Sequence, residues 1–155
     1  MSVAVYVLDA NVWIGFIHYT PMDIFVSLWG DLVEMVSDGT VIVPEEILRE
    51  VRSDKFRAAF VEHNLDSRFL NSYADRHCAL ADVANLCKGN RPKGADVELV
   101  AHALEIKNSG RLAVVVSEEK SSNGAVPPKV PDLCAPFNIP CIKKWDFIRE
   151  LGRRY

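Results

Sequence analysis

Residues 5–14 read VYVLDANVWI, and this stretch decides the fold class of the 155-residue chain. The residues before Asp9 are apolar and favour β-structure without polar alternation, which is typical of a strand buried on both faces. Asp9 follows directly, with Asn11 two positions later, before apolar residues resume. Because burial of a lone carboxylate is unfavourable by several kcal/mol unless something compensates it, Asp9 requires an explanation.

Short apolar segments alternate with helical patterns along the rest of the chain. Further strands are predicted at residues 41–43, 112–116 and 139–142, and helices at residues 21–39, from Pro44 onward, at 96–108 and at 145–151. This alternation predicts an α/β domain with a short, mostly parallel sheet. A chain of this length suits one domain, so residues 1–155 are expected to share a single core.

Two other segments have weaker patterns. Residues 121–131 (SSNGAVPPKVP) are rich in turn formers, and they are predicted to be an irregular loop with little capacity to pack. Residues 54–88 are predicted to be helical, with an inner face formed by Phe69, Leu70, Tyr73, Leu80 and Val83.

The composition limits the class of protein. No apolar run reaches the roughly 20 residues of a membrane span, and the N-terminus lacks the features of a signal peptide, so a cytoplasmic protein is expected. Four cysteines without a C-x-x-C pair are expected to be reduced, with a Cys134–Cys141 disulfide as the alternative. The net charge of −3 argues against coating nucleic acid by bulk electrostatics, but not against an enzyme acting on phosphodiesters.

Acidic residues follow two of the predicted strands directly. Asp9 ends the first strand, and Ser117, Glu118 and Glu119 come straight after residues 112–116 (LAVVV). In a parallel α/β sheet, ligands bind outside the carboxyl ends of the strands, and both groups fall at that edge.

The predicted helix at residues 96–108 supplies a third acid. Apolar residues stand three, four, seven and eight positions after Asp96, so Asp96 lies at the start of the buried stripe. Glu98 points to roughly the opposite side of the helix. His102 is expected to face away from the Asp96 stripe, and no catalytic role is assigned to it.

The predicted helix after Pro44 offers a choice of acids. Glu45 and Glu46 lie in its first turn, where acids favour the helix dipole whatever the function. Glu50 lies a turn deeper and closer to the apolar stripe, so it is preferred, with Glu46 as the alternative.

Four acids therefore become candidate metal ligands: Asp9, Glu50, Asp96 and Glu119, with Glu118 as an alternative to Glu119. Carboxylates with few nearby histidines or cysteines suit Mg²⁺ or Mn²⁺ rather than zinc. The sequence contains no H-E-x-x-H, P-loop or G-x-G-x-x-G motif. Such a carboxylate site supports metal-assisted hydrolysis of a phosphate ester.

The segments VLDANVWI, VPEEILREV, ADVELVAHAL and AVVVSEE resemble, in order, the four acidic motifs of PIN-domain ribonucleases, which include toxins of the VapBC toxin–antitoxin type. The tail KVPDLCAPFNIPCIKKWDFIREL is similar to a PIN subfamily known only as a domain of unknown function, DUF4411. The resemblance covers nearly the whole chain. It implies a three-layer α/β/α, PIN-like (Rossmann-like) fold, one or two Mg²⁺ or Mn²⁺ ions, endonucleolytic cleavage of RNA, a homodimer and an antitoxin partner.

Carried over by motif, the resemblance assigns the four acids to Asp9, Glu50, Asp96 and Glu119. Asn11 matches the polar residue two places after the first acid, and Ser117 matches the family's Thr or Ser. Glu119 departs from the pattern, since the family most often has Asp there. A longer side chain shifts the metal or leaves its contact to a water bridge.

Other interpretations remain for the same residues. Asp9 and Asp96 also suit helix N-termini, and Glu119 leaves open a degenerate PIN-like module that binds RNA or a protein without hydrolysis. A haloacid-dehalogenase-type phosphatase needs a second Asp where Asn11 stands.

The tryptophans and the basic loop residues form two further groups outside the acids. Trp13, Trp29 and Trp145 are expected to be core or subunit-contact residues. Lys88, Arg91, Lys93 and Lys120 are expected to be solvated loop residues, with phosphate binding as the alternative.

Overall fold

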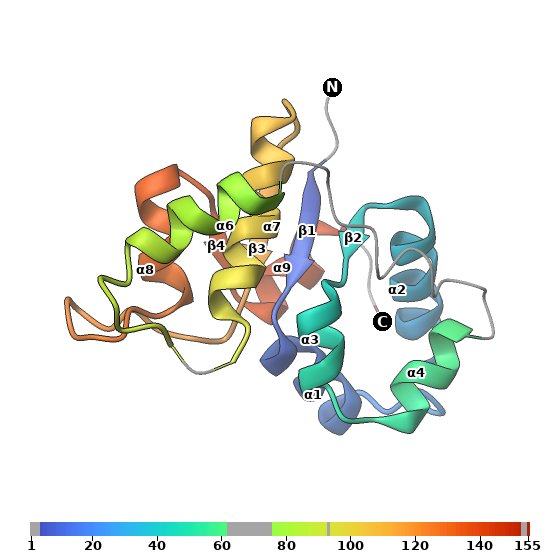
Figure 1. Cartoon of the computed structure of the whole chain (residues 1–155). Helices are drawn as coiled ribbons and strands as arrows, with labels where there is room; N and C mark the ends of the chain where they lie inside the picture. Colours follow the sequence, from blue (N-terminus) through green and yellow to red (C-terminus); the bar gives the residue numbers. More distant parts are fainter. Residues whose placement is uncertain (1–3, 62–75, 93, 153–154) are drawn as a thin grey trace.

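The structure is a computed structural model that describes residues 4–61, 76–92, 94–152 and 155, with the side chains of all these except residues 59–61 and 76–78. Figure 1 shows a central sheet with helices on both sides. The elements in chain order are β1 (Val5–Leu8), α1 (Ala10–Tyr19), α2 (Val26–Asp38), β2 (Val41–Ile42), α3 (Glu45–Glu50), α4 (Asp54–Val61), α6 (Arg76–Asn85), α7 (Asp96–Asn108), β3 (Ala113–Val116), α8 (Val130–Cys134), η1 (Ala135–Phe137), β4 (Cys141–Ile142) and α9 (Lys144–Glu150).

The sheet has four parallel strands in the order β2-β1-β3-β4. The central strands β1 and β3 pair in register from Val5 with Ala113 to Leu8 with Val116. All eight of their residues are buried, because α7 packs on β1 and β3, and Phe147 of α9 contacts Tyr6 of β1. The predicted α/β fold with a short parallel sheet is confirmed.

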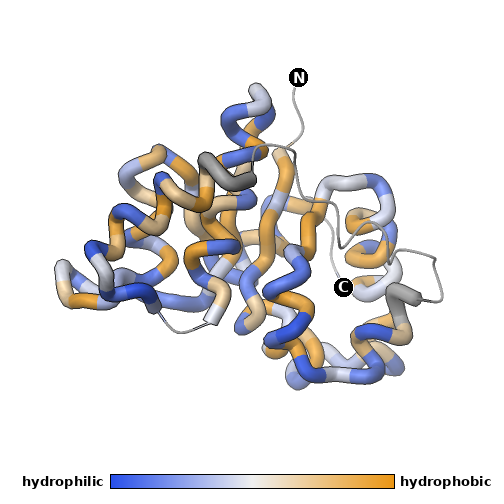
Figure 2. The backbone as a smooth tube through the Cα atoms, viewed as in Figure 1, coloured by the Kyte–Doolittle hydropathy of each residue, from blue (hydrophilic) through white to orange (hydrophobic). Residues whose placement is uncertain are grey.

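The core continues from the sheet into an aromatic cluster beneath α1. The side chain of Trp13 is fully buried and packs against Phe16, Trp29 and Phe56, with ring centroids 5.0–6.3 Å away. Figure 2 shows the hydrophobic strands enclosed by helices with hydrophilic outer faces. Of the three tryptophans, Trp13 and Trp29 are core residues as expected, whereas Trp145 is 47% exposed.

Most predicted elements are present within a residue or two of their predicted bounds. Helix α7 has the predicted bounds, and α2 ends at Gly39 in the left-handed conformation. Helix α1 agrees with the alternative interpretation of Asp9 as the N-cap of a helix after the first strand. The prediction of a loop for residues 121–131 is wrong at its end: α8 begins there, and Val130 is fully buried.

His102 is 2% exposed, because α7 is buried nearly all round, and its imidazole lies beside Glu46 of α3. One prediction is corrected at the cysteines. The alternative of a Cys134–Cys141 disulfide is wrong, since both thiols are free. The predicted inner-face residues Phe69, Leu70 and Tyr73, and Lys93, lie outside the described residues. None of the described helices is long and apolar enough to cross a membrane.

Trp13→Ala is expected to lower the free energy of unfolding by about 3–5 kcal/mol, because it leaves a large cavity between α1, α2 and α4. The measurement is urea denaturation followed by circular dichroism. The matched control is Ile24→Ala, whose side chain is 71% exposed and whose loss changes stability by about 0.5 kcal/mol or less. Equal shifts of the two midpoints would contradict the placement of Trp13.

Candidate metal centre

The pairing of β1 with β3 places Asp9 and Ser117 side by side at the carboxyl edge of the sheet. The backbone N–H of Asp9 donates to the carbonyl of Val116 at 2.9 Å, which extends the ladder by one bond. The N–H of Ser117 donates to Ile142 of β4 at 2.9 Å. The first side chains beyond the strands therefore meet at one point of this edge.

Asp9 is 3% exposed, and its carboxylate has two protein donors. Its Oδ1 accepts from the N–H of Ala10 at 2.7 Å, so Asp9 caps α1. Its Oδ2 accepts from the hydroxyl of Ser117 at 2.8 Å. Asp9 can therefore cap α1 and also take part in an acidic site. Capping alone does not account for the other acids near Asp9.

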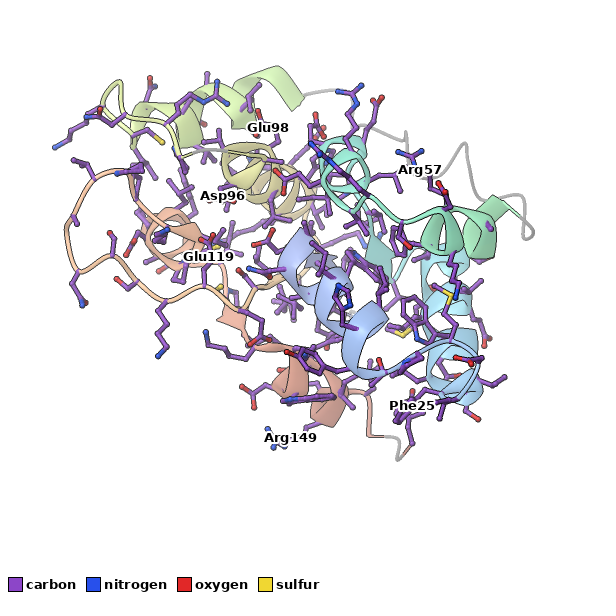
Figure 3. The ribbon with its side chains drawn as sticks, turned by 90° about the horizontal axis from the view of Figure 1, so that it is seen from below. Phe25, Arg57, Asp96, Glu98, Glu119 and Arg149 are labelled. Atoms are coloured by element: carbon purple, nitrogen blue, oxygen red, sulfur yellow. The ribbon has the colours of Figure 1, made fainter. Side chains whose placement is uncertain are left out.

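Three carboxylates from three elements converge here. Oxygens of Asp9, Asp96 and Glu119 all lie within 4.8 Å of one another, and both aspartates are buried. Figure 3 views the molecule from below and shows Asp96, at the start of α7, next to Glu119, in the loop after β3, with Glu98 farther away. We call these three residues the carboxylate cluster.

Burial and mutual repulsion raise the pKa of both aspartates. Burial, opposed by the hydrogen bonds from Ser117 and Ala10, raises the pKa of Asp9 to about 6, with smaller increases from Glu119 and Glu50. Burial also raises the pKa of Asp96 to about 7, and the charges of Glu119, Asp9 and Glu50 raise it further. Lys129 is a cation that acts in the opposite direction on Asp96. The negative charges around Asp96 therefore outweigh the positive charge of Lys129.

Glu50 lies beside the carboxylate cluster but makes a different contact. Its Oε1 accepts from the N–H of Ala95 at 2.6 Å, which joins the end of α3 to the start of α7. The chain at Gly94 makes room for it: a Cβ there would lie 2.4 Å from the same oxygen, and the backbone has φ of +84°. Glu50 is close enough to act on the pKa of both aspartates.

Glu119 reaches the cluster because its backbone and side chain are both fixed. Its N–H donates to the hydroxyl of Ser117 at 3.2 Å. Its Oε2 accepts from the N–H of Val130, the first residue of α8, at 3.0 Å. The segment predicted to be an unpacked loop therefore ends in a residue that holds one of the acids.

The alternative acids point elsewhere. Glu118 accepts from the N–H of Lys144 at 2.7 Å, toward α9. Glu46 lies 3.8 Å from the imidazole of His102, within the α3–α7 contact. Glu98 pairs with Arg91 at 2.9 Å. The geometry thus favours Glu50 over Glu46 and Glu119 over Glu118.

Asn11 and Lys143 contact the loop after β3 rather than the carboxylate cluster itself. The side-chain oxygen of Asn11 accepts from the N–H of Glu118 at 3.2 Å. The ammonium of Lys143 donates to the carbonyls of Glu118 and Glu119. Lys143, Val130 and Gly94 also support the site, and no sequence motif pointed to them. A start signal for α8 was available, since Pro131 and Asp132 stand in its first turn.

The donor set fits a hard divalent cation. The three carboxylates offer only oxygen atoms, and two of them are buried at raised pKa beside further acids. Such a group becomes favourable when a cation neutralises it, and carboxylate oxygens are ligands of Mg²⁺ and Mn²⁺. Asp9, Asp96 and Glu119 are the residues that can hold the ion, with Glu50 adjacent.

Fold and site together define a parallel α/β protein with a buried carboxylate cluster at the carboxyl edge of its sheet. The chain belongs to the family described as a domain of unknown function, DUF4411, which matches residues 6–155. No curated protein shows a significant match to it. Among solved structures, the chain is similar to a chain in the crystal structure of VapBC2 from Rickettsia felis bound to a DNA fragment from its promoter. The sequence identity is 16% and the TM-score is 0.49, and the alignment covers 90% of this chain and 98% of that chain.

Gly94→Ala is expected to destabilise the protein more than Gly89→Ala, by about 1.5–3 kcal/mol, the typical contribution of a hydrogen bond to a charged group. Both glycines have φ of +84°, so both variants carry the same backbone strain. A Cβ at residue 89 meets no atom within 4 Å, whereas one at residue 94 displaces Glu50 from Ala95. Chemical denaturation measures both, and equal losses would contradict the Glu50–Ala95 contact.

In excess EDTA, the free energy of unfolding is expected to fall as pH rises from 5 to 8. The pKa of Asp9 and Asp96 in the folded state, about 6 and about 7, lies above the unfolded value of about 3.9, so the folded state binds more protons in this range. Asp96→Asn should flatten this dependence. Urea denaturation at the two pH values tests it, and greater stability at pH 8 in the unmodified protein would contradict it.

Proposed function

We propose that this protein is a Mg²⁺- or Mn²⁺-dependent endoribonuclease of the PIN type. The observation that carries the proposal is the convergence of Asp9, Asp96 and Glu119 at the carboxyl edge of the sheet. Its support is the order and spacing of the four acidic motifs in the sequence, each of which contributes a residue in or beside the cluster. The overall acidity of the chain is compatible with an RNA substrate, because cations at the cluster reverse the local charge.

In this proposal Asp9, Asp96 and Glu119 hold the metal ions and Glu50 completes the ligand set. A bound divalent ion lowers the pKa of a coordinated water and stabilises charge on the phosphate during in-line attack. Ser117 orients the Asp9 carboxylate through its 2.8 Å hydrogen bond. Asn11 holds the loop that carries Glu118 and Glu119.

The wider biological assignment rests on the resemblance of the motifs to VapBC-type toxins. We propose that the protein is the toxin of a toxin–antitoxin pair, that it works in the cytoplasm as a homodimer, and that a small antitoxin inhibits it. Co-purification with the product of an adjacent gene tests the pairing, and the oligomeric state follows from light scattering.

Asp9→Asn and Asp96→Asn are each expected to lower cleavage of a single-stranded RNA by more than about 100-fold, which exceeds the usual effect of changing a residue that only supports a metal ligand. Cleavage by the unmodified protein should require Mg²⁺ or Mn²⁺ and stop in EDTA. The matched control is Glu98→Gln, which removes a carboxylate from the same turn of α7 outside the cluster. Undiminished cleavage by both aspartate variants would refute the proposal.

A module that binds RNA or a protein without hydrolysis is the second candidate, favoured by the Glu at position 119. It predicts binding of RNA without any metal-dependent cleavage. A Mn²⁺ titration followed by thermal unfolding separates the cases further, since an ion that binds the native state raises the melting temperature. Stabilisation by Mn²⁺ that Asp96→Asn removes supports the enzyme's metal centre.

A further inference from the structure

Lys143 makes contacts that are unusual for a half-buried lysine close to the acidic site. It follows β4 and precedes α9, and its ammonium donates to two consecutive carbonyls, those of Glu118 at 2.8 Å and Glu119 at 3.1 Å. Consecutive carbonyl oxygens that face one point repel each other unless a donor lies between them. The ammonium therefore stabilises a turn of the chain that would otherwise be unfavourable.

The turn is secured from the other side as well. The carboxylate of Glu118 accepts from the N–H of Lys144 at 2.7 Å, so contacts run in both directions between the loop after β3 and the start of α9. Asn11 holds the same loop from α1. Of these contacts, only the Lys143 ammonium bonds to the backbone of Glu119 itself.

The orientation of this backbone decides where the Glu119 carboxylate lies. One of its oxygens accepts from Val130 at the start of α8, and the carboxylate lies within reach of Asp9 and Asp96. Glutamate has one more rotatable bond than aspartate, so its carboxylate is positioned only when both its backbone and its far end are fixed. Lys143 binds the backbone carbonyl of Glu119, Ser117 accepts from its N–H, and Val130 fixes the far end of the side chain.

We propose that Lys143 is a positioning residue for the carboxylate cluster: by binding the carbonyls of Glu118 and Glu119 it holds the Glu119 carboxylate between Val130 and the two aspartates. This role rests on the proposed metal centre for its consequence, but the positioning itself does not require a metal. Lys143 touches no reacting atom in this role and acts through Glu119.

The test compares Lys143→Met, Lys143→Arg and Lys120→Met in two measurements made without RNA. Lys120 is the exposed residue next to Glu119, so Lys120→Met removes the same charge without removing the carbonyl contacts. The first measurement is the Mn²⁺ dissociation constant by electron paramagnetic resonance. Lys143→Met is expected to weaken Mn²⁺ binding about 10–100-fold, the usual effect of losing a residue that orients a metal ligand. Lys120→Met and Lys143→Arg should retain most of the affinity.

The second measurement is hydrogen exchange at the amide of Val130. As the first residue of α8 this amide has no partner inside its own helix, so its protection reports the bond to Glu119. Exchange should become at least about tenfold faster in Lys143→Met, as expected for loss of a bond to a charged group. It should stay unchanged in Lys120→Met.

The outcomes separate this proposal from the proposed function. If the unmodified protein binds no Mn²⁺, the metal centre is refuted, and the exchange of Val130 still decides the role of Lys143. Equal exchange and equal Mn²⁺ affinity in Lys143→Met and Lys120→Met would overturn the role. Were Lys143→Met too unstable to measure, Lys143→Gln takes its place: faster exchange at Val130 and weaker Mn²⁺ binding than in Lys143→Arg support the role, and equal values in the two variants overturn it.

Discussion

The in-register pairing of β1 with β3 is the constraint on which the site depends. Four consecutive residue pairs end at Leu8 and Val116, and the next bond joins Asp9 to Val116. Because neighbouring parallel strands end at the same edge of the sheet, the residues that follow them lie close together there. A shift by one residue would turn every strand side chain to the opposite face and separate Asp9 from Ser117. The register of β1 and β3 therefore determines which residues lie at the site.

The carboxylate cluster opposes folding, and the core offsets it. Like charges within 4.8 Å and burial of both aspartates favour their protonation, which is why both have a raised pKa. The fold tolerates them because the buried strands β1 and β3 and the aromatic cluster around Trp13 contribute to a large hydrophobic core. A structure that keeps unfavourable charges together in this way is expected at sites that bind a charged ligand.

The sequence predicted the parts of the site that follow from strand ends and helix periodicity. Asp9 and Asp96 were placed by these two rules alone, since each stands at a boundary with a clear apolar pattern on one side. Glu50 could be preferred over Glu46 but not placed, because its contact with Ala95 spans 45 positions and needs the left-handed turn at Gly94. Long-range contacts of this kind leave no local pattern.

Strand ends alone did not decide between Glu118 and Glu119, and the assignment of Glu119 came from the resemblance of the motifs. Adjacent residues after a strand point in different directions, and which one enters the site depends on how the following turn is held. Here that turn is held by Lys143, which lies 24 positions away on another strand's end. Val130, whose N–H binds the Glu119 carboxylate, lies in a segment whose prolines and glycine predicted a loop.

The unusual glutamate at position 119 has a structural explanation in this chain. The Glu119 carboxylate accepts from the N–H of Val130 at 3.0 Å and also lies within 4.8 Å of the carboxylates of Asp9 and Asp96. The start of α8 therefore supplies the N–H that binds the end of this side chain. The departure from the aspartate expected by resemblance therefore goes together with a helix that borders the site. The length of the residue at position 119 and the position of α8 are therefore linked in this chain.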